Sequence, residues 1–163
     1  MRLKTCHVGR LVLGIASTAM GLAASAAFAH PEHVHAQPSP VSFCHCGQCR
    51  RQHGHVGAYT TFPRDALRLV KDETLAWYPS SERARRGFCS RCGTGLFWDP
   101  VTEARMDATA GSLDEPTGLQ ADRHIWVDFK GDYYSLCDDG LLRRVSTDPG
   151  NQTLFNEETG KDQ

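Results

Sequence analysis

The sequence predicts a small, mainly β protein, mostly antiparallel, in which metal ions hold the strands together. Five of its seven cysteines lie in two short segments, residues 44–49 and 89–92. From residue 41 to residue 127, apolar and polar residues largely alternate with a period of two, and glycine or proline often interrupts the pattern. At 163 residues and a net charge of −1, the chain suits one domain with a modest core.

Short strands are expected wherever residues of high strand propensity run between turn signals. Pro63 ends the second of these runs, and residues 63–66 are compatible with a single helical turn; other helix signals are weak. Residues 138–140, Asp-Asp-Gly, predict the turn that closes the core. The predicted strands are residues 41–43, 58–62, 67–70, 75–78, 83–88, 96–98, 105–110 and 124–127.

The N-terminus has the pattern of a secretory signal peptide. Positive charges at Arg2, Lys4 and Arg10 precede an uncharged stretch, residues 11–28, and residues 27–29 fit a small-x-small cleavage site. Cleavage would remove residues 1–29, with Cys6 among them, and export would place the protein in the periplasm or outside the cell. A membrane anchor is one alternative, and a misassigned start, which would leave the protein in the cytoplasm, is another.

Composition divides the rest of the chain into three parts. Residues 30–40 are rich in histidine and proline and predict a polar linker, residues 41–147 form the metal-binding β domain, and residues 148–163 form a polar tail. Neither the net charge nor any aromatic-basic stripe favours a nucleic-acid partner. No stable membrane insertion is expected after cleavage.

The first cysteine cluster has the spacing of a metal site. Side chains two residues apart on a strand share a face, so Cys44 and Cys46 can bind one ion, and a turn at residues 47–48 would bring Cys49 to the same point. Thiolates in this arrangement favour zinc (Zn2+). A redox pair or a disulfide remains an alternative, particularly because export favours disulfides. A purely apolar burial of these thiols is disfavoured because Gln48 and arginines lie among them.

Together these motifs resemble the family of glutathione-dependent formaldehyde-activating enzymes and centromere protein V. The segments that carry the resemblance are residues 44–51, 77–81, 85–94, 110–116 and 124–127. The resemblance implies a β-tent fold, with two layers of antiparallel strands around zinc. It also implies that Cys44, Cys46 and Cys49 form a catalytic-type zinc site with an open position.

The same resemblance implies that Cys89 and Cys92 are half of a structural four-cysteine zinc site. The other half is normally a C-x-C-G segment about twenty residues before the triple cluster, and residues 1–43 contain none, so the N-terminus is atypical. His33 and His35 have the spacing to substitute for it. Alternatively, one shared site could join Cys46 and Cys49 to Cys89 and Cys92, so one or two zinc ions are expected per chain.

The resemblance implies a carbon–sulfur lyase-type enzyme that adds glutathione, or a similar thiol, to formaldehyde and forms the S-hydroxymethyl adduct. Arg50, Arg51 or Arg85 would pair with the glutathione carboxylates. Three thiolates donate much charge to zinc, so a thiol carrier without real catalysis is a second hypothesis. A third is a zinc-stapled domain that binds a protein partner.

Several conspicuous side chains are expected to have ordinary roles. His45 should face away from the ligands on either side of it, and Cys137, with no cysteine near it, should be a packed or free thiol. His124 could line the cleft at the start of a strand. Core or pocket-wall positions are expected for Trp77, Trp98 and Trp126, and solvent exposure is expected for His53 and His55.

Overall fold

The computed structural model describes residues 11–12, 32–34, 36–69 and 72–148, and it describes only the backbone of the first two segments. The predicted signal peptide therefore lies outside the described residues except for two of its positions. The chain divides into two compact units, residues 1–38 with 62–118 and residues 39–61 with 119–163. Within the part of the chain that is described, no helix is both long and apolar enough to cross a bilayer.

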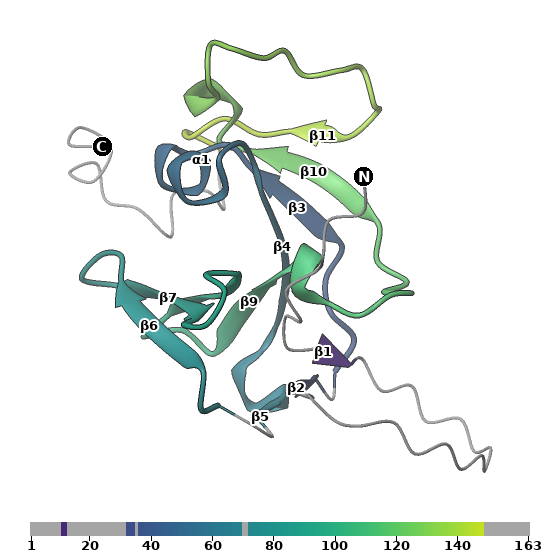
Figure 1. Cartoon of the computed structure of the whole chain (residues 1–163). Coiled ribbons are helices and arrows are strands. Elements are labelled where there is room, and N and C mark those ends of the chain that lie inside the picture. Colours follow the sequence, from purple (N-terminus) through teal and green to yellow (C-terminus); the bar gives the residue numbers. More distant parts are fainter. Residues whose placement is uncertain (1–10, 13–31, 35, 70–71, 149–163) are drawn as a thin grey trace, which may run out of the picture. The chain divides into compact units, whose positions relative to one another are not determined.

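The second unit contains the first cysteine cluster and the one α-helix of the described residues. Its strand β10 lies between β3 and β11 and is parallel to both, whereas β3 and β4 are antiparallel (Figure 1). Its elements are β3 (Val41–Cys44), α1 (Gly47–His53), β4 (Gly57–Pro63, which ends in the first unit), β10 (Ala121–Ile125), the 3-10 turn η3 (Val127–Phe129) and β11 (Leu142–Arg143).

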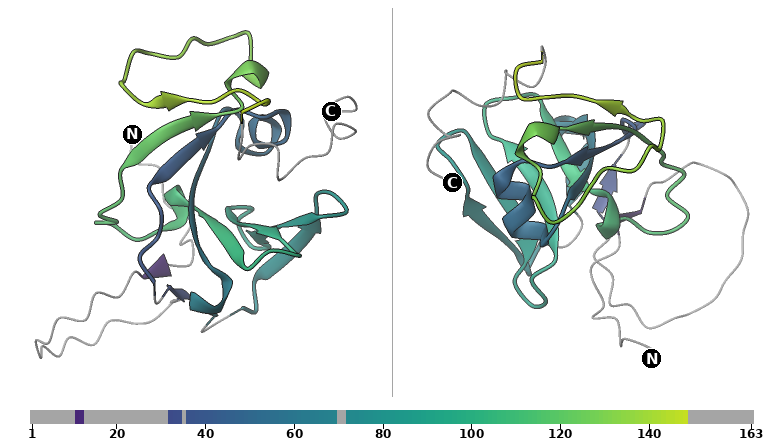
Figure 2. Two further views of the ribbon diagram at one scale, coloured as in Figure 1. Left: turned by 180° about the vertical axis from the view of Figure 1, so that it is seen from behind. Right: turned by 90° about the horizontal axis from the view of Figure 1, so that it is seen from above.

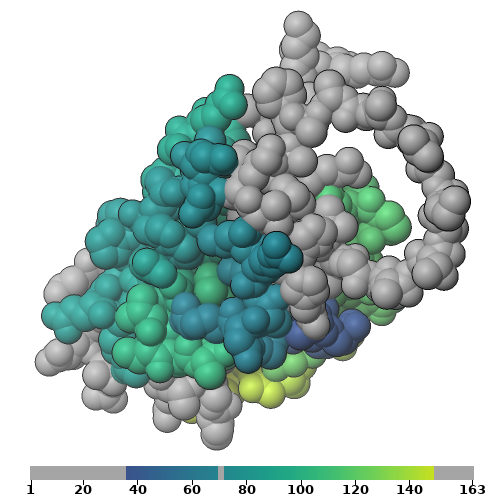
Figure 3. Space-filling model, turned by 90° about the horizontal axis from the view of Figure 1, so that it is seen from below, coloured from purple at the N-terminus to yellow at the C-terminus, as the bar shows by residue number. Residues whose placement is uncertain are grey.

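The first unit is built around four strands, β6 to β9, that follow one another along the chain; β6, β7 and β8 pair antiparallel, and so do β8 and β9 (Figure 2). A smaller sheet joins β5 antiparallel to β2, and β1 parallel to β2. Residues of this unit, coloured teal and green, occupy much of the face in Figure 3. Its elements are β1 (Leu11–Val12), β2 (Glu32–Val34), η1 (Arg64–Ala66), β5 (Leu67–Leu69), β6 (Leu75–Pro79), β7 (Ala84–Cys89), β8 (Gly95–Pro100), β9 (Arg105–Thr109) and η2 (Ala110–Ser112).

The prediction of a mainly β, mostly antiparallel fold is confirmed, and the sheet that contains β10 is mixed because β10 is parallel to both of its neighbours. Hairpins and short connections produce antiparallel neighbours, and the period-two pattern cannot distinguish the two directions. Strands β3 and β10 are separated by most of the domain sequence, so nothing local specified that they would lie parallel.

The apolar core of the first unit forms along β8 and β9. Phe97 and Ala108 are opposite one another in the β8–β9 register and are almost completely buried. Trp77 stacks on Phe97 with 6.0 Å between ring centroids. A Cβ at Gly87 would lie 3.0 Å from each ring, so glycine allows this close approach of the rings to the strand without a shift of either ring.

One buried carboxylate, Asp99, joins the surrounding segments of this unit. It has no exposed surface and accepts hydrogen bonds from Arg64 at 2.5 Å and from Arg85 at 2.7 Å, while Arg85 also lies over the Trp77 ring. Burial acts to raise the pKa of Asp99, but the two arginines outweigh it, and the net pKa is lowered. Asp99 is therefore charged in the folded protein and links η1 to strands β7 and β8.

Replacing Asp99 with asparagine should lower the free energy of unfolding by about 2 to 3 kcal/mol, because both arginines lose their charged partner. The loss should not be larger, because Arg64 and Arg85 are partly exposed and water can solvate their charges. Urea unfolding measures the change in the free energy of unfolding. Since the folded pKa is depressed, the difference from wild type should shrink as the pH falls below about 4.

The matched control is Asp122→Asn, whose ion pair with Arg123 joins two side chains that are each about one-third exposed. Its loss should be below about 1 kcal/mol. Equal losses in the two variants would contradict the central role of Asp99.

Candidate metal centre

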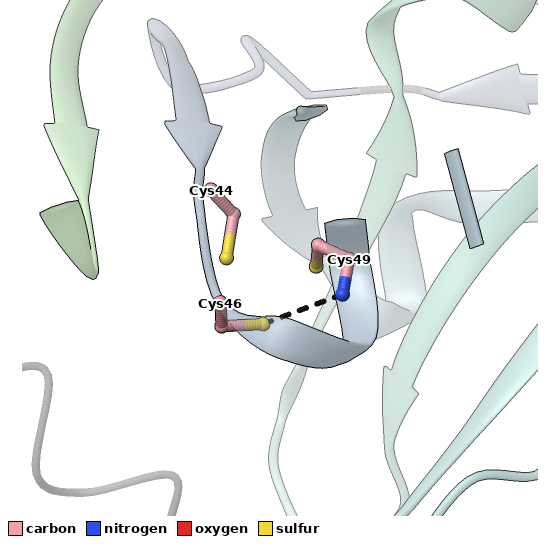
Figure 4. Close-up of side chains that lie close together, drawn as sticks. All are labelled: Cys44, Cys46 and Cys49. Carbon is pink, nitrogen blue, oxygen red and sulfur yellow. Dashed lines mark hydrogen bonds between the residues drawn. The ribbon is translucent and has the colours of Figure 1, made fainter. Parts of the chain in front are cut away.

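Three cysteines from adjacent elements of the second unit converge on one point. Cys44 ends β3, Cys46 caps the N-terminus of α1, and Cys49 lies in the first turn of that helix (Figure 4). Their sulfur atoms all lie within 4.8 Å of one another, and each residue is less than a tenth exposed. Among the described residues, this is the one group of three or more histidine, cysteine or acidic side chains close enough to hold a single ion.

A short helix, rather than the simple turn that we expected, brings Cys49 into the cluster. Cys46 has an extended backbone, and its Sγ accepts a hydrogen bond from the Cys49 backbone N–H at 3.4 Å, as an N-cap side chain does. The helix then closes with Arg50 N–H donating to the Cys46 carbonyl at 2.9 Å. It ends at Gly54, whose φ of 74° is a left-handed conformation that glycine adopts readily.

The neighbouring strand leaves room for the cluster at Gly57. This residue is opposite Cys44 in the β3–β4 register. A Cβ at position 57 would lie 2.6 Å from the Tyr59 ring and 3.2 Å from the Cβ of Cys49. A side chain here would force the Tyr59 ring to move and would press on Cys49, so glycine allows β4 to approach the cluster closely.

The donor set fits a zinc ion. At a Zn–S distance of about 2.3 Å, tetrahedral geometry places two sulfurs roughly 3.8 Å apart. The sulfur–sulfur distances in the cluster are at most 4.8 Å, which is only about one ångström more than this value. Hydrogen bonds with Cys46 and Cys49 raise the pKa of the Cys44 thiol well above its usual range, and burial adds to the effect.

His45 lies between two of the cysteines but takes no part in the cluster. Its Nδ1 is 2.5 Å from the Tyr134 hydroxyl, and its Nε2 is 2.8 Å from Nδ1 of His124. Both ring nitrogens are thus engaged elsewhere, in agreement with the expectation that this side chain faces away from the ligands. Among the described residues, no fourth histidine, cysteine or acidic side chain joins the three sulfurs closely enough to share one ion with them.

The second cysteine pair lies in the first unit, at the end of β7. Gly93, with a φ of 76°, donates its N–H to the Cys89 carbonyl at 2.7 Å and turns the chain tightly around the pair. The Sγ of Cys92 is 3.3 Å from the Thr94 hydroxyl. The pair could bind metal, but a complete second site stays a prediction: the His33 side chain and all of His35 lie outside the described residues, and a site shared with the first cluster is untested.

Cys137 and the two histidines that follow the cluster, His53 and His55, differ in exposure and in their contacts. Cys137 is exposed, and no disulfide joins the six described cysteines. His53 contacts the Tyr59 hydroxyl at 2.7 Å and is only partly exposed, whereas His55 is exposed and its ring packs edge-on against Tyr134.

His124, expected at the start of a strand and in a cleft, is instead buried in β10 and hydrogen-bonded through both nitrogens. Among the tryptophans, Trp98 is buried, and Trp77 and Trp126 are partly exposed. Sequence reasoning missed Tyr134 and Asp139 as neighbours of these histidines, because no motif or spacing marks them.

A model of the glutathione-dependent formaldehyde-activating enzyme family matches residues 31–129. The chain belongs to this family. The match includes all five clustered cysteines and ends before Tyr134 and Asp139.

No curated protein matches the chain. Among solved structures, a Rhodobacter sphaeroides protein determined as a structural genomics target is 24% identical to it, with a TM-score of 0.41. That alignment covers 49% of this chain and 73% of the other, and the similarity is too low to support any conclusion.

Replacing Cys49 with serine should abolish metal binding at the first cluster, because a serine hydroxyl is a poor ligand for a soft site. Zinc per chain, measured by atomic emission after purification without chelator, should fall by about one ion. Replacing the exposed Cys137 with serine is the control and should change nothing. Unchanged zinc in the Cys49 variant would remove the assignment of the site.

Zinc binding at neutral pH should release protons, because the ion binds thiolates and the raised pKa keeps Cys44 protonated in the metal-free protein. Apparent affinity should therefore decrease as the pH falls. Titration calorimetry in two buffers with different ionisation enthalpies measures the protons released. Binding with no proton release would show that the cysteines are not the ligands.

Proposed function

We propose that this protein uses zinc held by Cys44, Cys46 and Cys49 to promote the addition of glutathione, or a similar thiol, to formaldehyde. The observation that carries the proposal is the cluster itself, in which three buried sulfurs converge without a fourth described ligand. Structural zinc sites are closed by four protein ligands, whereas catalytic sites keep one position open. Membership of the formaldehyde-activating family supports the same chemistry.

When bound, zinc would lower the pKa of a thiol at the open position, so that the thiol is nucleophilic near neutral pH. The protein holds the three ligand sulfurs through β3 and the cap of α1, and burial keeps water away from them. Formaldehyde is already electrophilic. The site therefore has mainly to position and ionise the thiol.

The reaction balances without any oxidant or reductant. The glutathione sulfur forms a bond to the formaldehyde carbon while the π bond of the carbonyl breaks. The thiol loses its proton, and the new alkoxide oxygen gains one, so that the product is the S-hydroxymethyl thiohemiacetal. Proton exchange with solvent is sufficient for this step.

Among the arginines considered for the glutathione carboxylates, Arg50 is the best placed. It follows Cys49 in α1, and its Nε is buried without a hydrogen-bond partner, so a carboxylate would complete its surroundings. Arg51 is exposed, and the Arg85 Nε already donates to Asp99 in the other unit.

Two other functions predict different behaviour of the same site. A thiol carrier would bind glutathione at the open position without accelerating the addition, because three thiolates weaken the Lewis acidity of zinc. A zinc staple for a protein interface would not respond to glutathione at all.

The zinc-loaded protein should accelerate the disappearance of glutathione and formaldehyde above the rate in buffer at matched concentrations. In a cobalt-substituted sample, glutathione should change the visible absorption spectrum, because its sulfur enters the coordination sphere, whereas S-methylglutathione should not. A spectral change without acceleration would identify a carrier. No response in either measurement would favour the staple.

A further inference from the structure

Four side chains of the second unit form a continuous hydrogen-bonded line, which we call the histidine network. The Tyr134 hydroxyl is 2.5 Å from Nδ1 of His45, whose Nε2 is 2.8 Å from Nδ1 of His124. The Nε2 of His124 is in turn 2.8 Å from a carboxylate oxygen of Asp139. His45 is 2% exposed and His124 is 7% exposed, so the centre of the line is closed to water.

The carboxylate fixes the direction of every hydrogen bond in the line. Hydrogen bonds from His124 and from the backbone lower the pKa of Asp139, which is therefore a carboxylate and can only accept. With both histidines neutral, His124 donates through Nε2 and accepts at Nδ1, so His45 donates through Nε2 and accepts at its own Nδ1. Tyr134 must donate its hydroxyl hydrogen to that nitrogen. Each histidine thus has one defined neutral tautomer.

A second metal site does not explain this arrangement. The two nitrogens of His124 contact different partners on different sides of its ring, so the side chains do not converge. The 2.8 Å between His45 and His124 is also shorter than the roughly 3.3 Å that two nitrogen ligands keep on one zinc ion. The short distances are those of hydrogen bonds.

The network holds the backbone segment that carries two of the cysteines. His45 lies between Cys44 and Cys46, and its own N–H donates to the Ile125 carbonyl of β10 at 3.0 Å. Its ring stacks on Tyr134, with 5.7 Å between centroids, and is held at both nitrogens. A ring fixed in this way restricts rotation of the residue that joins the two cysteines.

Both ends of the network come from a segment beyond the family match, which stops at residue 129. Local contacts hold this segment in shape. Lys130 Nζ donates to the Tyr134 carbonyl at 2.9 Å, and Asp139 accepts from the Leu141 N–H at 3.1 Å. The match to the family model therefore covers His45 and His124 but neither of their outer partners.

We propose that Tyr134 and Asp139 are positioning residues, which hold His45 in one tautomer and one orientation through His124 and thereby keep Cys44 and Cys46 in the geometry that binds zinc. The effect on zinc binding rests on the proposed zinc site, whereas the hydrogen bonds of the network do not depend on it. Residues that orient ligands from outside the coordination sphere commonly change metal affinity by about 10- to 100-fold.

The variant Asp139→Asn tests the direction of the network at the exposed end of the line. An asparagine can donate as well as accept, so the direction of every hydrogen bond in the network can reverse. His45 would then donate through Nδ1 to the Tyr134 hydroxyl. Nitrogen-15 NMR of the metal-free variant should show a mixture of tautomers at His45 and His124, against one tautomer in wild type. Zinc affinity, from competition with a chromophoric chelator, should fall about tenfold.

The control is Asp138→Asn, the neighbouring carboxylate outside the network, which should leave both measurements at wild-type values. A second pair is Tyr134→Phe, which removes the hydroxyl that His45 accepts from, and Tyr133→Phe, which removes the neighbouring exposed hydroxyl. Zinc affinity should fall in Tyr134→Phe alone.

Folded Asp139→Asn and Tyr134→Phe variants with wild-type zinc affinity would overturn the inference, as would mixed tautomers in the wild-type protein. If the wild-type protein binds zinc, shows the fixed tautomers and loses affinity in these variants, but does not accelerate the thiol addition, the inference stands and the proposed function fails.

Discussion

The convergence of three sulfurs is the constraint on which the second unit depends. Two of them are presented by a strand end and by the residue that caps a helix, so the direction of β3 and the start of α1 are fixed together. The hydrogen bond from the Cys49 N–H to the Cys46 sulfur holds the second and third cysteines together even without a metal ion. The absence of a side chain at Gly57 then allows β4 to approach the same point.

The sequence predicted this cluster because its information is local. Spacings of two and three residues place side chains together whatever the rest of the chain does. The mainly β architecture followed from the period-two pattern for the same reason. The expected turn after Cys46 is a helix instead, because a cap residue and a left-handed glycine define α1 without the apolar periodicity by which longer helices are predicted.

Interactions that join distant residues were not predictable in this way. His45 and Tyr134 are 89 residues apart, and His45 and His124 are 79 apart. The neighbours of β10 are parallel strands from different parts of the chain. Asp99 and its arginines likewise sit in ordinary strand and turn contexts, and only the pairing of those segments shows that the carboxylate is buried.

In the proposed function, an anionic thiol needs positive charge close to the cluster, because the metal centre itself would not supply it. Three thiolates and one Zn2+ would carry a net charge of −1, and the helix that begins at the cluster carries Arg50, whose Nε is buried without a hydrogen-bond partner. His45 adds no positive charge near neutral pH, because burial, with help from His124, His55 and Lys130, lowers its pKa to about 4.

In the proposed function, His45 would therefore supply no charge to attract the substrate, and Arg50 of α1 would supply it. The proposed substrate, a carboxylate-bearing thiol such as glutathione, would use both parts of this arrangement, with its sulfur toward the cysteines and a carboxylate toward Arg50. A neutral thiol would use only the first.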